Sequence, residues 1–253
     1  MIKHTIKRIV GRVVPRAGVQ LMSKLAGGQF VPDGFRRLRH MRSLGFDPRV
    51  IWDCGAYVGA WTAEVSTIFP RARFLLAEPN HAMTGIIKRN IRRVLPNSVI
   101  FTGAVSDTRG SGYLNVWNNK ETAAAGSSLL PHVQGTPQQR LPVEIRTLDD
   151  LSQEHHVIPD LVKLDLQGAE LSALRGAGSL FGKTELFVIE FGCLEAYIGR
   201  TSPHQLCEVM YNHGYRLYDV VNLEYRPYDQ ALCGGDFFFL YQESKLRVHK
   251  GFY

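Results

Sequence analysis

The sequence has few cysteines and no long apolar run. Its four cysteines form no CxxC pair and have no histidines at metal-ligand spacing: Cys54, Cys193, Cys207 and Cys233. We therefore expect reduced thiols in a cytoplasmic protein and no cysteine-based metal site. No stretch approaches the ~20 apolar residues that a membrane-spanning helix needs. Since no continuous apolar segment follows the basic start, we also expect no cleaved signal peptide.

Acidic residues are nearly absent from the first part of the chain. Residues 1–49 hold eleven Lys or Arg and two acids, a net charge of +9 within a chain of net charge +7. The other 204 of the 253 residues therefore sum to −2. Because the excess charge is confined to one segment, it does not indicate a nucleic-acid partner. We divide the chain into a basic, mainly helical N-terminal segment, 1–49, and a domain, 50–253.

Residues 2–14 place their apolar side chains on one helical face, surrounded by lysines and arginines, and Pro15 ends the pattern. The apolar positions are Ile2, Ile6, Ile9, Val10, Val13 and Val14. Such a helix can lie on an anionic bilayer, which would place the protein peripherally at the inner face of the membrane. It can equally pack on the body of the protein with its charges in water. The sequence leaves both possibilities open.

From Arg49 onward, apolar runs of strand length alternate with helix-like segments. We expect strands at 50–54, 72–78, 98–105, 141–147, 160–166, 185–191, 215–221 and 236–242. Expected helices are 59–69, 80–95, 148–155, 168–180 and 203–213. This alternation predicts an α/β fold of Rossmann-like type, with a mostly parallel sheet and helices on both faces.

Two segments depart from the alternation. The last two expected strands are joined by a polar connection without a helix, which predicts an antiparallel C-terminal edge hairpin. Residues 106–140 are rich in Gly, Ser, Asn, Gln and Pro. There we expect a short hairpin near 112–117 followed by a mobile loop.

The first expected strand ends in a glycine turn that lacks one glycine of the dinucleotide fingerprint. Residues 53–59 read Asp-Cys-Gly-Ala-Tyr-Val-Gly. A dinucleotide site directs a helix N-terminus at a pyrophosphate, and Asp53 immediately before the turn would repel that group. S-adenosylmethionine has no phosphate and carries cationic groups, so the pattern favours it. The alternative is a turn whose glycines only let helix 59–69 pack closely.

Further candidate cofactor residues follow the next two strands. Glu78, in Glu78-Pro79-Asn80, ends the second strand, where a carboxylate can accept hydrogen bonds from ribose hydroxyls. This spacing alone does not separate NAD from S-adenosylmethionine. Ser106 and Asp107 follow the third strand, where an adenine amino group would lie, although Ser-Asp is also ordinary turn chemistry. The predicted cofactor-binding residues are Asp53, Gly55, Ala56, Gly59, Glu78, Pro79, Asn80, Ser106, Asp107 and Asp165.

Three acids are expected at one edge of the sheet. Asp165 ends a strand just before Gly168, Glu190 lies near the end of strand 185–191, and Asp236 opens the last strand. Because an antiparallel strand begins where its parallel neighbours end, the three carboxylates approach one place. They can share a proton, bind a cation or hold substrate hydroxyls, or remain solvated strand ends. Glu170, in the first turn of the next helix, can be a simple partner of the helix dipole.

Together these residues resemble the FkbM-type methyltransferase family over Val50 to Tyr241. The carriers are residues 53–59, 78–80, 104–107, 127–129, 147–150, 163–170, 174–177 and 235–236. The resemblance implies a class I methyltransferase fold and methyl transfer from S-adenosylmethionine to oxygen. It also implies an acceptor hydroxyl on a sugar, a glycolipid, a polysaccharide or a macrolide-like natural product. Gln167 stands where many relatives have a glutamate, so no acid role is carried over to it.

These observations lead to the hypothesis of an S-adenosylmethionine-dependent O-methyltransferase. Asp165 would border both ligands, while Glu190 and Asp236 would orient or deprotonate the acceptor hydroxyl. The rivals are a nicotinamide dehydrogenase, a nucleic-acid methyltransferase and a non-catalytic docking module with a vestigial nucleoside pocket. The need for a divalent metal, the acceptor and the oligomeric state are left open by the sequence.

Overall fold

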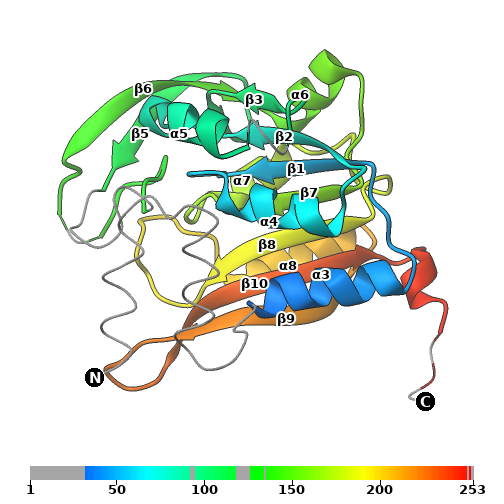
Figure 1. The fold of residues 1–253 in the computed structure, drawn as a ribbon. Helices are drawn as coiled ribbons and strands as arrows, with labels where there is room; N and C mark the ends of the chain where they lie inside the picture. The colour runs from blue at the N-terminus through cyan, green and yellow to red at the C-terminus, as the bar shows by residue number, and fades with distance from the viewer. Residues whose placement is uncertain (1–31, 92–94, 118–125, 134, 250, 252–253) are drawn as a thin grey trace, which may run out of the picture.

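A computed structural model of the chain describes residues 32–91, 95–117, 126–133, 135–249 and 251 (Figure 1). The expected amphipathic helix at 2–14 and residues 118–125 of the expected loop lie outside this range.

A seven-stranded sheet forms the centre of the fold, with strand order β3-β2-β1-β7-β8-β10-β9. The five parallel strands are β1 (Val50–Cys54), β2 (Arg73–Ala77), β3 (Val99–Phe101), β7 (Leu161–Leu164) and β8 (Leu186–Gly192). The strands β9 (Tyr215–Tyr225) and β10 (Leu232–Tyr241) form an antiparallel hairpin, and β10 also pairs antiparallel with β8. The predicted mostly parallel sheet with an antiparallel C-terminal edge is confirmed.

Helices cover both faces of this sheet, as the alternating residues of its buried strands require. In β1, Trp52 joins a core cluster that contains residues of α6 (Leu148–His155), α7 (Glu170–Arg175) and α8 (Pro203–Asn212). Its neighbour Ile51 points to the opposite face and joins residues of α3 (Asp33–Ser43), α4 (Ala60–Ile68) and α5 (His81–Ile91). Figure 1 shows α3 and α4 in front of the sheet and α8 behind it. A short 3₁₀ helix, Lys245–Arg247, is the last element among the described residues.

The structure contains a second, three-stranded sheet, and two of the expected strands are wrong because of it. The strands β4 (Ala104–Val105), β5 (Gly110–Val116) and β6 (Gln139–Arg146) are ordered β4-β6-β5. The expected strand 98–105 is therefore two strands in two sheets, and the expected strand 141–147 lies outside the main sheet. The expected strand is interrupted at Gly103, where an added Cβ would stand 2.3 Å from the ring of Phe101. The predicted hairpin near 112–117 is one strand, β5, paired antiparallel with β6.

The helix α3 belongs to the basic segment and is packed into the body. Its side chains Leu38 and Met41 are buried in the same core cluster as α4 and α5. Arg37 forms an ion pair with Asp219 of β9. No helix among the described residues is long and apolar enough to cross a bilayer.

Two helix boundaries differ from the expected ones because of glycines. The expected helix 168–180 is only α7, Glu170–Arg175. Gly168 has φ +101°, a left-handed conformation that delays the start of the helix. At the other end, an added Cβ at Gly176 would lie 2.5 Å from the carbonyl oxygen of Ser106, so the chain turns against β4 there.

Candidate active site

The turn after β1 is pressed against the end of β7. Gly55 has φ +85°, and the amide nitrogens of Gly55 and Ala56 both donate to the carbonyl oxygen of Ala77, at 2.9 and 3.1 Å. The amide nitrogen of Asp165 donates to the carbonyl oxygen of Cys54 at 3.0 Å. An added Cβ at Gly55 would stand 1.9 Å from the carbonyl oxygen of Asp165. Only glycine fits this place, both for its backbone angle and for its surroundings.

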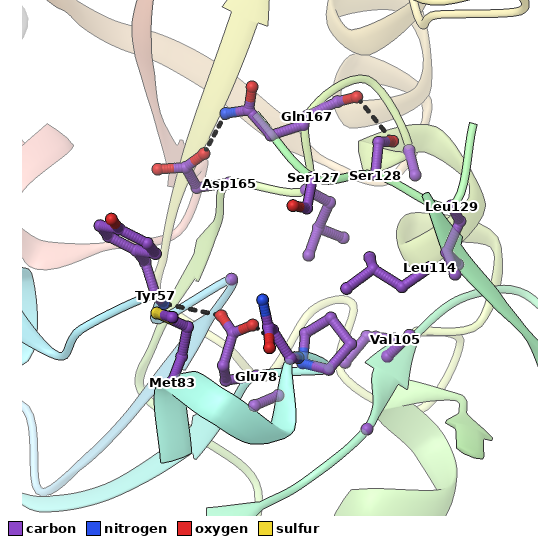
Figure 2. A pocket seen from close by; sticks show the side chains of 18 residues that line it. Tyr57, Glu78, Met83, Val105, Leu114, Ser127, Ser128, Leu129, Asp165 and Gln167 are labelled. Atoms are coloured by element: carbon purple, nitrogen blue, oxygen red, sulfur yellow. Dashed lines mark hydrogen bonds between the residues drawn. The ribbon is translucent and has the colours of Figure 1, made fainter. Parts of the chain in front are cut away.

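Glu78 follows β2 and is only 6% exposed. Its Oε2 accepts from the amide nitrogen of Tyr57 at 2.8 Å, and its Oε1 accepts from the amide nitrogen of Asn80 at 2.8 Å (Figure 2). Burial raises the pKa of Glu78 from its ordinary value of 4.5 to about 7, against the effect of these two hydrogen bonds. Each oxygen keeps a lone pair for a further donor.

A cavity of about 200 Å³ opens at the carboxyl ends of β1, β2 and β7. This is more than ten times the ~10–15 Å³ that one water molecule needs, so the cavity is not a packing void. Glu78 and Met83 lie at one end, and Asp165 and Gln167 lie at the other (Figure 2). The small sheet and the segment between β5 and β6 supply apolar walls, which include Val105, Leu114 and Leu129.

An amide side chain links the acids at the second end of the cavity. Gln167 Nε2 donates to Asp165 Oδ1 at 2.9 Å and to Glu190 Oε2 at 3.0 Å. Tyr197 in turn donates its hydroxyl to Gln167 Oε1 at 3.1 Å. On the other side of Asp165, Lys163 Nζ donates to Oδ2 at 2.8 Å. Asp165 is therefore held from two directions while it borders the cavity.

The pKa values of the two neighbouring acids are shifted in opposite directions. Burial alone would raise the pKa of Asp165, but the charge of Lys163 and the hydrogen bonds from Lys163 and Gln167 outweigh it, and the pKa lies below its ordinary value. Burial, followed by the charges of Asp165 and Glu170, raises the pKa of Glu190 well above its ordinary value. The environment consequently pushes the two pKa values apart, so Asp165 gives up its proton more readily than Glu190 does.

Asp53 lies beneath the glycine turn rather than on the cavity wall. It is fully buried and accepts from Thr62 Oγ1 at 2.6 Å. Lys163 Nζ lies 4.0 Å from Asp53 Oδ1, so the lysine stands between Asp53 and Asp165. Burial would lower the pKa of Lys163, but the charges of Asp165 and Asp53 raise it overall, and the lysine stays charged.

The predicted cofactor residues separate into two groups. Those that line the cavity are Gly55, Glu78, Pro79, Asn80 and Asp165, and those that do not are Asp53, Ala56, Gly59, Ser106 and Asp107. Gly59 has φ +75° and precedes α4, and an added Cβ would lie 3.4 Å from Ile91 of α5. Asp107 is exposed and accepts hydrogen bonds from the hydroxyls of its neighbours Ser106 and Thr108. The adenine contact expected of Ser106 and Asp107 stays a prediction.

Asp236 lies directly opposite Glu190 in the antiparallel register of β10 and β8. Its Oδ2 accepts from Asn222 Nδ2 at 2.7 Å, and Asn222 Oδ1 accepts from the amide nitrogen of Gly34 at 3.0 Å. Burial raises the pKa of Asp236. The fold thus brings Asp165, Glu190 and Asp236 to one edge, but of the three only Asp165 lines the cavity.

Several side chains of this site were not predicted. Lys163 is a charged residue within an apolar strand beside a strand-end acid, a signal that the sequence did contain. Tyr197 reaches Gln167 from a loop 30 positions away, and no sequence pattern indicates that contact. Glu170 accepts from the amide nitrogens of Leu166 and Gly168, so it closes the loop before α7 in addition to any effect on the helix dipole.

The model of the FkbM methyltransferase domain matches residues 53–217, more than half of the chain. The chain belongs to the FkbM methyltransferase family. It is thus a methyltransferase, and its methyl donor is S-adenosylmethionine. A comparison with curated proteins finds no match.

The chain is also similar in structure to solved methyltransferases. Precorrin-6y C5,15-methyltransferase from Geobacter metallireducens is 16% identical with a TM-score of 0.46, over 84% of this chain and 88% of that one. Magnesium protoporphyrin IX methyltransferase from Synechocystis, with bound SAH, is 10% identical with a TM-score of 0.49, over 93% of this chain and 99% of that one. The family assignment rests on the domain match.

The cavity residues fit S-adenosylmethionine. Glu78 presents a buried carboxylate to ribose hydroxyls, apolar walls suit an adenine ring, and Asp165 offers negative charge for a cationic group. No lysine or arginine of the described residues lines the cavity, so a pyrophosphate would lack a basic partner there. No group of three metal-binding side chains that could hold an ion is found in the described part of the chain.

Proposed function

We propose that this methyltransferase transfers the methyl group to a hydroxyl oxygen of a sugar, a glycolipid or polysaccharide, or a macrolide-like natural product. The observation that carries the proposal is Asp165, an ionised carboxylate fixed on the cavity wall by Lys163 and Gln167. A fixed anion can accept a hydrogen bond from an acceptor hydroxyl and align its oxygen for in-line attack.

The bound cofactor supplies an electrophilic methyl group on a sulfonium. During transfer the hydroxyl oxygen forms a bond to the methyl carbon, the carbon–sulfur bond breaks, and the hydroxyl proton is lost. Asp165 is the base in this proposal, because its carboxylate is ionised and borders the cavity. Lys163 and Gln167 keep its oxygens directed, so the proton is received at a defined position.

Glu190 and Asp236 have supporting roles in this proposal. The pKa of Glu190 is raised and that of Asp165 is lowered, and pKa values that are pushed apart in one site are typical of an acid and a base with different tasks. In its protonated form, which the raised pKa favours, Glu190 can donate a hydrogen bond to a second oxygen of a polyol acceptor. Asp236, opposite Glu190, extends the polar surface on the acceptor side.

Two measurements test the proposed function. Calorimetry should detect binding of S-adenosylhomocysteine to the full chain. Methyl transfer from labelled S-adenosylmethionine should then be assayed against mono- and oligosaccharides, glycolipids, macrolides and RNA. A base-stable methyl ether on a saccharide, a glycolipid or a macrolide supports the proposal, whereas a methylated amine, or methyl transfer to RNA at any position, contradicts it. Cofactor binding without transfer to any panel member favours the docking module.

Asp165→Asn and Asp229→Asn form a matched pair for this assay. Asp229 is an exposed aspartate that pairs with Arg226 at a distance from the cavity. Only the first substitution should abolish transfer. Equal activities of the two variants would remove Asp165 from the proposed chemistry.

A further inference from the structure

Arg200 lies flat against the end of the acid cluster, in a place that two glycines leave free. An added Cβ at Gly168 would lie 3.0 Å from Cγ of Arg200, and an added Cβ at Gly192 would lie 2.0 Å from Cζ of Arg200. Gly192 is two residues beyond Glu190 on β8, so the two positions share one face of the strand. The guanidinium therefore occupies the surface next to Glu190, where any side chain at position 192 would displace it.

The guanidinium lies near Glu190, whose carboxyl it attracts, but it has no hydrogen-bonded anionic partner within the described residues. Arg200 Nε is buried and has no hydrogen-bond partner, and no described carboxylate forms an ion pair with Arg200. By contrast, Arg37 pairs with Asp219, and Arg226 pairs with Asp229. A buried donor without a partner costs free energy, which a ligand that accepts its hydrogen bond would recover.

The position of Arg200 connects it to the reacting end of the cavity. Its Cζ lies 5.8 Å from the ring centre of Tyr197, and the Tyr197 hydroxyl donates to Gln167, which lines the cavity. Burial raises the pKa of Glu190 beside it, and the charge of Arg200 offsets only part of this rise. A ligand that reaches Asp165 with one hydroxyl can thus meet a planar cation further along the same molecule.

We propose that Arg200 binds an anionic group, a carboxylate or a phosphate, carried by the methyl acceptor. This inference rests on the proposed function and narrows its acceptor to an acidic one, such as a uronic acid or a sugar phosphate. A guanidinium fork fits the oxygens of either group with two parallel hydrogen bonds. The cation–π contact with Tyr197 keeps the fork in one orientation.

A structural role gives a different expectation. If Arg200 only balanced the charge of Glu190, its removal would weaken all acceptors equally and would shift the pH profile of the site. If Arg200 recognises the acceptor, its removal weakens acidic ligands and leaves neutral ones unchanged.

Binding of three probes tests this without any turnover. Glucose, glucuronic acid and glucose 1-phosphate are titrated into the full chain saturated with S-adenosylhomocysteine, and affinities are measured by NMR. We expect wild type to prefer an acidic probe over glucose by on the order of tenfold or more, and the stronger acidic probe identifies carboxylate or phosphate as the group. Arg200→Gln should lose this preference and keep its affinity for S-adenosylhomocysteine.

Arg140→Gln is the matched control, because Arg140 also stacks on a tyrosine, Tyr113, but is exposed and lies outside the cavity lining. It should retain the wild-type preference. Arg200→Lys keeps the charge without the planar fork and should show a weakened preference for acidic probes. This variant also keeps the test possible if Arg200→Gln does not fold. Equal binding of neutral and acidic probes by wild type, or an unchanged preference in the Arg200 variants, overturns the inference. A failure to bind S-adenosylhomocysteine would instead overturn the proposed function.

Discussion

Gly55 and Asp165 touch through their backbones: the space for a Cβ at Gly55 is occupied by the carbonyl oxygen of Asp165. The first residue belongs to the turn that borders the cofactor end of the cavity, and the second is the proposed base. One contact between β1 and β7 therefore fixes the distance between the two halves of the site. We therefore expect a change at the turn to displace Asp165, the proposed base.

Gly55→Ala tests this contact. We expect a loss of stability of about 2 kcal/mol or more, because alanine meets both a positive φ and a backbone clash. Urea unfolding measures the loss, and calorimetry should show impaired binding of S-adenosylhomocysteine. Gly110→Ala is the control, since an added Cβ at Gly110 meets nothing within 4 Å. A Gly55→Ala protein as stable as Gly110→Ala would contradict the described turn.

Glu78 should make stability depend on pH. Its pKa is about 7 in the folded protein, above the ordinary value of 4.5, so the folded state binds more protons between these values. Stability from this group is consequently retained below about pH 4.5 and decreases as pH rises to 7, by about 3 kcal/mol in total. The difference in unfolding free energy between wild type and Glu78→Gln, measured from pH 4.5 to 8, should show this slope. A flat difference would mean that burial does not shift the pKa of Glu78.

The same group should make cofactor affinity depend on pH in the opposite direction. Ribose hydroxyls donate to the ionised carboxylate, so binding has to release a proton wherever Glu78 is protonated. Affinity for S-adenosylhomocysteine should therefore rise from pH 6 to 7.5 and level off above that. Calorimetry in two buffers of different ionisation enthalpy would reveal the released proton. An affinity that is constant over this range would separate Glu78 from the cofactor.

Gln167→Glu should shift the pH dependence of turnover. The substitution replaces the amide that donates to Asp165 and Glu190 with a third carboxylate. Because a lost donor and an added charge both raise the pKa of Asp165, we expect the acidic limb of the pH–rate profile to move to higher pH. Gln205→Glu, at the start of α8, is an exposed control. Superimposable profiles would show that Gln167 does not act on Asp165.

Asp236→Asn separates the acceptor side from the cofactor side. We place Asp236 with the acceptor, so the variant should have lower turnover and nearly wild-type affinity for S-adenosylhomocysteine. Asp165→Asn should lower turnover by on the order of 10²-fold or more. Wild-type turnover of Asp236→Asn would show that Asp236 has no role in the reaction and serves only to accept the hydrogen bond from Asn222.

The basic N-terminal residues give a prediction about membranes. We propose that residues 1–16 attach the protein to anionic bilayers, where a lipid-linked acceptor would be found. Attraction of about 1 kcal/mol per basic residue near the surface is screened by salt. Binding to phosphatidylserine vesicles should weaken as salt rises and be lost in a chain without residues 1–16. A truncated chain that aggregates would indicate core packing instead.

The parallel part of the main sheet could be predicted because its strands are short and mostly apolar. Residues 50–54 and 186–192 are buried on both faces, which a sequence records as an apolar run. The small sheet could not be predicted in the same way. β5 and β6 carry many exposed polar residues, and their partners are set by the turn at Gly103.

The site was predictable where the backbone dictates residue type. Gly55 and Glu78 stand at strand ends that open α/β sheets use for ligands, so their place was visible from spacing alone. The network around Gln167 was not, because it depends on side chains from three separate segments. The surroundings of Asp53 were equally hidden, because no sequence pattern indicated its hydrogen bond from Thr62 or the nearby Lys163.

Cys54, at the end of β1, is a chemical probe for local opening of the site. Its thiol is fully buried beside Gly55, and burial raises its pKa, whereas Cys193 is exposed. Thiol reagents should therefore modify Cys193 quickly and reach Cys54 only when β1 separates from its neighbours. The rate of Cys54 modification then reports how often β1 and the turn after it open. Its slowing by S-adenosylhomocysteine would measure how firmly the ligand closes that turn, before any acceptor is known.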